Sequence, residues 1–148
     1  MSTYTQIIYQ IVFSTKYREP VLHKKGRREL FNYIKGIITK KGCKVYEING
    51  VEDHIHILTH LHQSIALASL VKDIKVASSM YIKEKNLFKG FLSWQLGYGA
   101  FTYNVREKEK LVNYVRKQEV HHARKSSADE LIELLAENGV EYDERFLE

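Results

Sequence analysis

The stretch Ile7-Ile8-Tyr9-Gln10-Ile11-Val12-Phe13 decides the fold of this chain. It lies inside positions 5–16, where β-branched and aromatic residues predominate, and this composition favours a β-strand. Successive side chains of a strand point to opposite faces of a sheet, and apolar residues here occupy both parities. We therefore expect a central strand that is covered on both faces.

Helical and strand-like patterns alternate along the rest of the chain, with apolar residues spaced for one helix face or for strands. The expected helices are at 27–41, 64–83, 107–124 and 129–138, and the expected strands are at 5–16, 44–49, 54–61, 91–95 and 100–104. This order is that of an α+β, ferredoxin-like split βαβ sandwich. Such a fold has a four-stranded antiparallel sheet with helices on one face, here followed by C-terminal helices. Its open face would be a binding platform.

Length and composition indicate one soluble domain covering residues 1–148. The single cysteine, Cys43, allows no internal disulfide and no zinc cluster, which fits a reducing compartment. The N-terminus has no secretory signal pattern, and no apolar run approaches the roughly 18 residues of a membrane helix. We expect a cytoplasmic protein with no membrane partner.

Charge is distributed unevenly along the chain. Residues 128–148 hold eight acidic residues and one basic residue, so this tail, an acidic helix and its extension, has a net charge of −7. Residues 1–127 hold 22 basic and 10 acidic residues, a net charge of +12. A basic body of this kind suits a polyanion such as nucleic acid. The alternative is a solvated, lysine-rich surface.

The motif His54-Ile55-His56 places two imidazoles on the same side of a strand. Two imidazoles on a rigid strand can bind one divalent metal ion. The alternative is a pair of histidines on a sheet face without a ligand. Ile55 would then point to the core, and Asp53 is expected at a turn or as an outer hydrogen-bond partner rather than as a direct ligand.

Tyr114 and Gln118 are spaced to lie one turn apart on the same face of a helix. A phenol attacks poorly at neutral pH unless a base or a metal-activated electrophile assists it. The Gln118 oxygen would be the third ligand of a Mg²⁺ or Mn²⁺ ion bound by His54 and His56. Attack by Tyr114 on a DNA phosphate would give a 5′-phosphotyrosine and a free 3′-hydroxyl. The alternative is an ordinary packing stripe.

A glycine loop, Gly97-Tyr98-Gly99, lies between aromatic residues that could stack on unpaired bases or pack in a core. His121 and His122, which follow Gln118, could contact phosphate or end a solvated helix. The residues expected to contact DNA are Lys16, Arg18, Lys72, Lys75, Trp94 and Tyr98.

Together these motifs resemble the HUH-type single-tyrosine transposases of insertion sequences that move as single-stranded DNA, whose relatives include the REP-associated tyrosine transposases. HUH denotes histidine, hydrophobic residue, histidine. The resemblance runs in order from Tyr9 to about His122, at family-like spacing. Its motifs are Asp53-His54-Ile55-His56, Trp94-Gln95-Leu96-Gly97-Tyr98-Gly99 and Tyr114-x-x-x-Gln118-x-x-His121-His122.

The resemblance implies a ferredoxin-like homodimer that cuts and rejoins single-stranded DNA with hairpin ends. Tyr114 would be the nucleophile, and His54, His56 and Gln118 would be the metal ligands. The tyrosine helix would cross between subunits, so each active site would be shared. Lys117 departs from the asparagine that relatives often carry. The alternatives are a related HUH nuclease, such as a replication initiator or relaxase, or a non-catalytic or domesticated nucleic-acid-binding protein.

Overall fold

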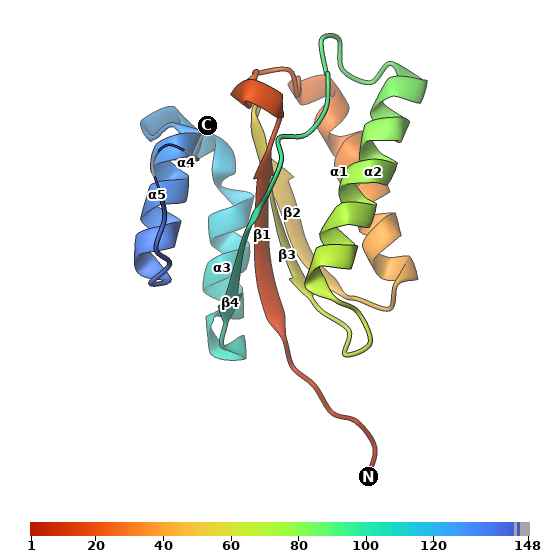
Figure 1. The fold of residues 1–148 in the computed structure, drawn as a ribbon, viewed down its shortest axis with the longest axis vertical. Helices are drawn as coiled ribbons and strands as arrows, with labels where there is room; N and C mark the ends of the chain where they lie inside the picture. Colours follow the sequence, from red (N-terminus) through yellow and green to blue (C-terminus); the bar gives the residue numbers. More distant parts are fainter. Residues whose placement is uncertain (144, 146–148) are drawn as a thin grey trace.

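The computed structural model describes residues 1–143 and 145, in which a four-stranded sheet lies between two layers of helices (Figure 1). The strands are β1 (Ile8–Ser14), β2 (Val45–Gly50), β3 (His54–His60) and β4 (Gly99–Tyr103). The helices are α1 (Lys24–Lys40), α2 (Leu67–Lys85), α3 (Lys108–Arg116), α4 (Gln118–Arg124) and α5 (Ser127–Glu137), with short 3-10 turns η1 (Lys16–Arg18) and η2 (Val105–Glu107).

The sheet has the strand order β2-β3-β1-β4, and each neighbouring pair is antiparallel. Strand β1 is therefore central, as its two-sided apolar pattern predicts. Its register with β3 pairs Val12 with His56 and Ser14 with His54. The predicted ferredoxin-like fold is confirmed.

Helices cover both faces of the sheet, which corrects the expectation of an open face (Figure 1). Helices α1 and α2 pack on one face, where Phe13 and Ile57 belong to the main core. On the other face, α3 packs through Leu111 and Val115 against Ile8 and Leu58, and α5 packs through Leu134 and Leu135 against Val12 and Phe101. Apolar residues on both faces of β1 require this second layer.

Residues 91–95 do not form the expected strand, because their aromatic side chains are used for packing instead. Trp94 makes only an isolated bridge to Thr15, and its ring packs edge-on against Phe13 at 4.9 Å between centroids. The Trp94 indole N–H donates to the Ser78 hydroxyl at 2.9 Å. Within the described residues, the helices are all too short or too polar to cross a bilayer.

Candidate active site

His54 and His56 begin strand β3 and lie buried between the sheet and the C-terminal helices. Their exposed fractions are 2% and 0%. Because they alternate with Ile55 and Ile57, both rings point to the face that α3, α4 and α5 cover. A Cβ at Gly50 would come within 2.5 Å of the His54 carbonyl oxygen, so glycine allows the close approach that starts β3. The two rings share a face as expected, but the face is buried.

Each histidine is oriented by a hydrogen bond from its outer ring nitrogen. His54 Nδ1 donates to Asp53 Oδ1 at 2.7 Å, as expected of Asp53 as an outer partner. His56 Nδ1 donates to Gln10 Oε1 at 2.9 Å, and Gln10 Nε2 donates to the Tyr103 hydroxyl at 2.9 Å. These bonds leave the Nε2 lone pairs of both histidines directed toward the interior, as in metal-binding histidines.

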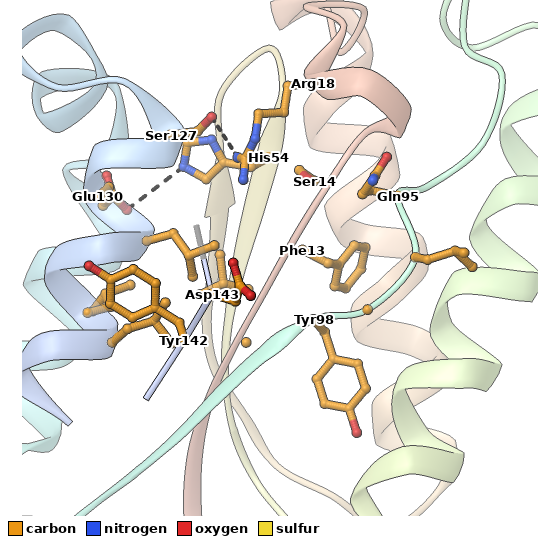
Figure 2. Close-up of a pocket in the computed structure, with 17 residues that line it drawn as sticks. Phe13, Ser14, Arg18, His54, Gln95, Tyr98, Ser127, Glu130, Tyr142 and Asp143 are labelled. Carbon is orange, nitrogen blue, oxygen red and sulfur yellow. Dashed lines mark hydrogen bonds and ion pairs between the residues drawn. The ribbon is translucent and has the colours of Figure 1, made fainter. Parts of the chain in front are cut away.

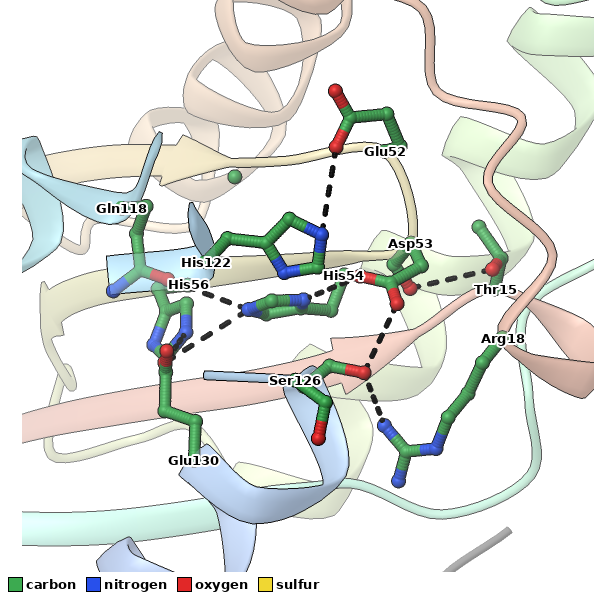
Figure 3. Close-up of polar contacts among 12 residues, drawn as sticks. Thr15, Arg18, Glu52, Asp53, His54, His56, Gln118, His122, Ser126 and Glu130 are labelled. Atoms are coloured by element: carbon green, nitrogen blue, oxygen red, sulfur yellow. Dashed lines mark hydrogen bonds and ion pairs between the residues drawn. The ribbon is translucent and has the colours of Figure 1, made fainter. Parts of the chain in front are cut away.

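Gln118 comes close to this pair because the helix that carries it is broken. One helix was expected over 107–124, but Lys117 has φ −97° and ψ 25° and separates α3 from α4. Asn49 on β2 donates through Nδ2 to the Arg116 carbonyl at 2.9 Å. In a continuous helix this carbonyl would instead accept from a backbone N–H of the next turn. Gln118 is fully buried, and its Oε1 lies 3.3 Å from His54 Nε2 (Figure 3).

Tyr114 lies on α3 beside the histidines. Its ring stands edge-on to His56 at 5.9 Å between centroids and stacks on His121 at 4.7 Å. Burial raises the pKa of Tyr114 well above its usual value, and the nearby negative charge of Glu130 raises it further. The metal-free site therefore disfavours the phenolate.

Tyr114 and Gln118 meet His54 and His56 of the same chain. The resemblance implied that a partner subunit would supply the tyrosine helix, and this sharing between subunits stays a prediction. Helix α3 packs against β2 and β3 of its own sheet, because Leu111 and Val115 cover Ile8 and Leu58 there. A single chain thus brings together all four residues that the sequence pointed to.

Sequence reasoning missed Glu130, which lies closest to the ring nitrogens of the two histidines. It comes from α5, is 4% exposed, and its Oε1 lies 2.6 Å from His56 Nε2 and 3.8 Å from His54 Nε2 (Figure 3). Burial tends to raise the pKa of this carboxyl, but His54 and His56 outweigh it and lower the pKa well below its usual range. In the sequence the only signal was an acidic residue on a short amphipathic helix.

The donor atoms fit a divalent cation. His54, His56 and Glu130 each offer one ligand atom, and these atoms lie within 4.8 Å of one another. His56 Nε2 and both Glu130 oxygens are buried, and Nε2 meets Glu130 Oε1 at 2.6 Å. The 2.6 Å separation of His56 Nε2 and Glu130 Oε1 is that of a hydrogen bond, so a proton can hold this pair together until a metal ion replaces it. A set of imidazole nitrogens with amide and carboxylate oxygens suits manganese, and magnesium less closely.

The residues expected to contact DNA differ in their exposure to solvent. Lys16, Lys72 and Tyr98 are exposed. Trp94 is buried in the core, so it packs inside the protein and is not available to stack on a base. Lys75 donates through Nζ to the carbonyls of Gln95 and Gly97 and so holds the glycine loop.

Arg18 contributes to the support of the site. Its guanidinium donates to the Ser127 hydroxyl at 3.0 Å (Figure 2), and that hydroxyl donates to Asp53 Oδ2 at 3.0 Å. His122, on α4, has its Nε2 3.7 Å from Glu52 Oε2.

A cavity of about 360 Å³ opens beside His54 (Figure 2). The glycine loop lines one side through Gln95 and Tyr98, and α5 lines the other through Ser127 and Glu130. Its walls join apolar side chains to polar groups at the histidine end. This combination suits a flat, partly polar ring such as a nucleobase.

Comparisons with known proteins point to one family. The sequence model of the family described as "Transposase IS200 like" matches residues 3–118. The chain is 25% identical over 115 residues to the transposase of insertion sequence element IS200 from Salmonella typhimurium, covering 74% of this chain and 75% of that protein. It is 28% identical over 120 residues to the ISDra2 transposase TnpA of Deinococcus radiodurans, covering 76% and 84%.

Two solved structures share the fold. A candidate transposase from Deinococcus radiodurans superposes with a TM-score of 0.63 at 21% identity, over 80% of this chain and 95% of that one. A REP-associated tyrosine transposase bound to a REP hairpin superposes with a TM-score of 0.59 at 18% identity, over 82% and 74%.

Proposed function

Because the chain belongs to the IS200-like transposase family, we propose that it cuts and rejoins single-stranded DNA through Tyr114, with a divalent metal ion. The observation that carries the proposal is the meeting of four side chains in one buried place. Gln118 Oε1 lies 3.3 Å from His54 Nε2, the ring nitrogens of His54 and His56 group together, and the Tyr114 ring stands next to His56. Ligands and nucleophile together are what phosphoryl transfer by tyrosine requires.

The side chains divide the work of the reaction. The Tyr114 oxygen attacks phosphorus, loses its proton and forms a 5′-phosphotyrosine, while the 3′ oxygen leaves and takes up a proton. A bound Mg²⁺ or Mn²⁺ would polarise the phosphate, and His54, His56 and Gln118 would hold it. Rejoining is the reverse attack by a 3′-hydroxyl. The covalent bond conserves the phosphodiester energy, so no nucleotide cofactor is needed.

Single-stranded DNA with hairpin ends is the proposed substrate. The net charge of +12 over residues 1–127 favours a polyanion, and one structural relative was solved with a REP hairpin. Exposed Lys16 and Lys72 are proposed to contact phosphates. The cavity beside His54 is proposed to receive a base next to the cleaved phosphate, with Tyr98 at its wall.

The test is incubation of the protein with element-end oligonucleotides and Mn²⁺, followed by denaturing electrophoresis. Wild type should form a covalent protein–DNA adduct, and Tyr114→Phe should form none. Tyr4→Phe removes a hydroxyl at a position that is 82% exposed and should leave the adduct unchanged. DNA binding without an adduct, indifferent to Mn²⁺ and to Tyr114→Phe, would instead indicate a non-catalytic binding module.

We also propose a homodimer, in which each chain completes its own active site. The same assay tests the arrangement with mixed variants, after light scattering has established the mass of the particle. Tyr114→Phe mixed with His56→Ala should remain inactive, because neither chain has a complete site. Recovered activity in the mixture would show that Tyr114 acts on the partner's histidines.

A further inference from the structure

Helix α5, the last helix of the described chain, carries the buried carboxylate of Glu130 into the candidate metal site. We propose that Glu130 is an anionic ligand of the bound metal ion, so that the C-terminal helix is part of the active site. This inference rests on the proposed metal-dependent function. The family match ends at residue 118, so Glu130 lies outside the region shared with the family.

The spacing of the donor atoms suits a shared ion. Neighbouring ligands of an octahedral ion with bonds of about 2.1 Å lie roughly 3 Å apart. The Glu130 Oε1 atom lies 2.6 Å from His56 Nε2 and 3.8 Å from His54 Nε2, and Gln118 Oε1 lies 3.3 Å from His54 Nε2. These separations bracket the octahedral value. Four protein ligands would leave two positions for phosphate oxygens or water.

An anionic ligand would favour a cation at this depth. Two neutral imidazoles and an amide oxygen leave the charge of a divalent cation uncompensated until a phosphate or hydroxide binds, whereas a carboxylate offsets part of it from the start. Asp53 is turned away, because its carboxylate accepts hydrogen bonds from His54 Nδ1 and the Ser127 hydroxyl. Among the described residues, Glu130 is the acid whose carboxylate groups with the ring nitrogens of both histidines.

The start of α5 is anchored so that Glu130 is aimed in advance. The Ser126 hydroxyl caps the helix by accepting from the Asp129 N–H at 3.2 Å. The Ser127 hydroxyl is held by Arg18 and by Asp53, the outer partner of His54. Glu130 follows Ser127 by three residues and therefore lies on the same helix face. A carboxylate fixed in this way loses little freedom on binding a metal ion.

The experiment measures Mn²⁺ binding by the full chain without DNA. Protein stripped with a chelator is titrated with Mn²⁺, and the electron paramagnetic resonance signal of free aqueous Mn²⁺ gives the dissociation constant. Glu130→Gln keeps the size and removes the charge. Glu133→Gln is the matched control, since it makes the same change one turn further along α5 at an exposed position. Circular dichroism checks that each variant is folded.

We expect Glu130→Gln to weaken Mn²⁺ binding by at least tenfold, since loss of even an outer partner costs about 10- to 100-fold. Glu133→Gln should stay within twofold of wild type. Should Glu130→Gln fail to fold, Glu130→Asp answers instead, because it keeps the charge on a shorter arm and should weaken binding severalfold.

Binding by the glutamine variant within twofold of wild type would overturn the inference. Tighter binding would also overturn it, because Glu130 would then occupy the place of the metal and oppose it. In both cases the proposed function stands if wild type still forms the Tyr114 adduct with Mn²⁺. Absence of Mn²⁺ binding by folded wild type would refute both proposals.

Discussion

Raising the pH should destabilise the metal-free protein through His54. Burial lowers the pKa of this imidazole, but hydrogen bonds to Asp53 and Glu130 outweigh it and raise the pKa from 6.5 to about 9. A group whose pKa is higher in the folded state stabilises the fold fully below its unfolded pKa. That contribution is lost as the pH rises through the folded value. We therefore expect the free energy of unfolding to fall between pH 6.5 and about 9.

The size of the effect follows from the gap between the two pKa values. At about 1.36 kcal/mol per pKa unit, the gap corresponds to roughly 3 kcal/mol. This is an upper figure, because the contact with Glu130 also lowers the pKa of that carboxyl and its energy counts once. Burial lowers the pKa of His56, so its titration affects stability below pH 6.5 and leaves the alkaline window to His54.

The assay is denaturant unfolding with a chelator present, at steps from pH 6.5 to 9.5. Wild type should lose about 2 to 3 kcal/mol of unfolding free energy. Asp53→Asn, which removes the negative charge beside His54 Nδ1, should lose less than half of that. His23→Gln, at an exposed position, is the control and should follow wild type. A wild-type stability constant to within about 1 kcal/mol, or an equal slope in Asp53→Asn, would refute the reasoning.

Two substitutions test the supports of the site. Gln10→Met removes the acceptor for His56 Nδ1 and should weaken Mn²⁺ binding about tenfold. Paramagnetic resonance measures this affinity, and an unchanged affinity would mean that Gln10 does not orient the His56 ring. Leu134→Ala, at 5% exposure between α5 and β1, should cost about 2 to 4 kcal/mol in denaturant unfolding. Hydrogen exchange should then be faster in α5 than in α1, and uniform exchange would contradict a local role.

The fold was predictable because its signals are local. The apolar residues of β1 occupy both parities, which predicts a central strand, and the sheet order places β1 between β3 and β4. Helices α1 and α2, whose apolar residues recur at helical spacing, form where expected to within a few residues. The error at 91–95 has a simple origin: Trp94 and Phe91 resemble strand residues in composition, but they pack edge-on in the core.

The candidate site was predictable in part. Strand alternation places His54 and His56 on the same side, so their pairing needs no tertiary information. Tyr114 and Gln118 both come close to the histidines although the helix breaks at Lys117 between them. The break itself follows from Asn49 on β2, which binds a carbonyl of α3 across the fold.

The sequence by itself determined most of the order of strands and helices, the shared face of the two histidines and the position of Tyr114 one turn before Gln118. These features arise from the periods of two and 3.6 residues, which neighbouring positions encode. Only the tertiary structure decided that the histidine face is covered, that Tyr114 lies beside His56 within the described chain, and that Glu130 reaches His56. Those outcomes depend on how α3 and α5 dock on the sheet, and docking depends on contacts between segments far apart in sequence, which no local spacing records.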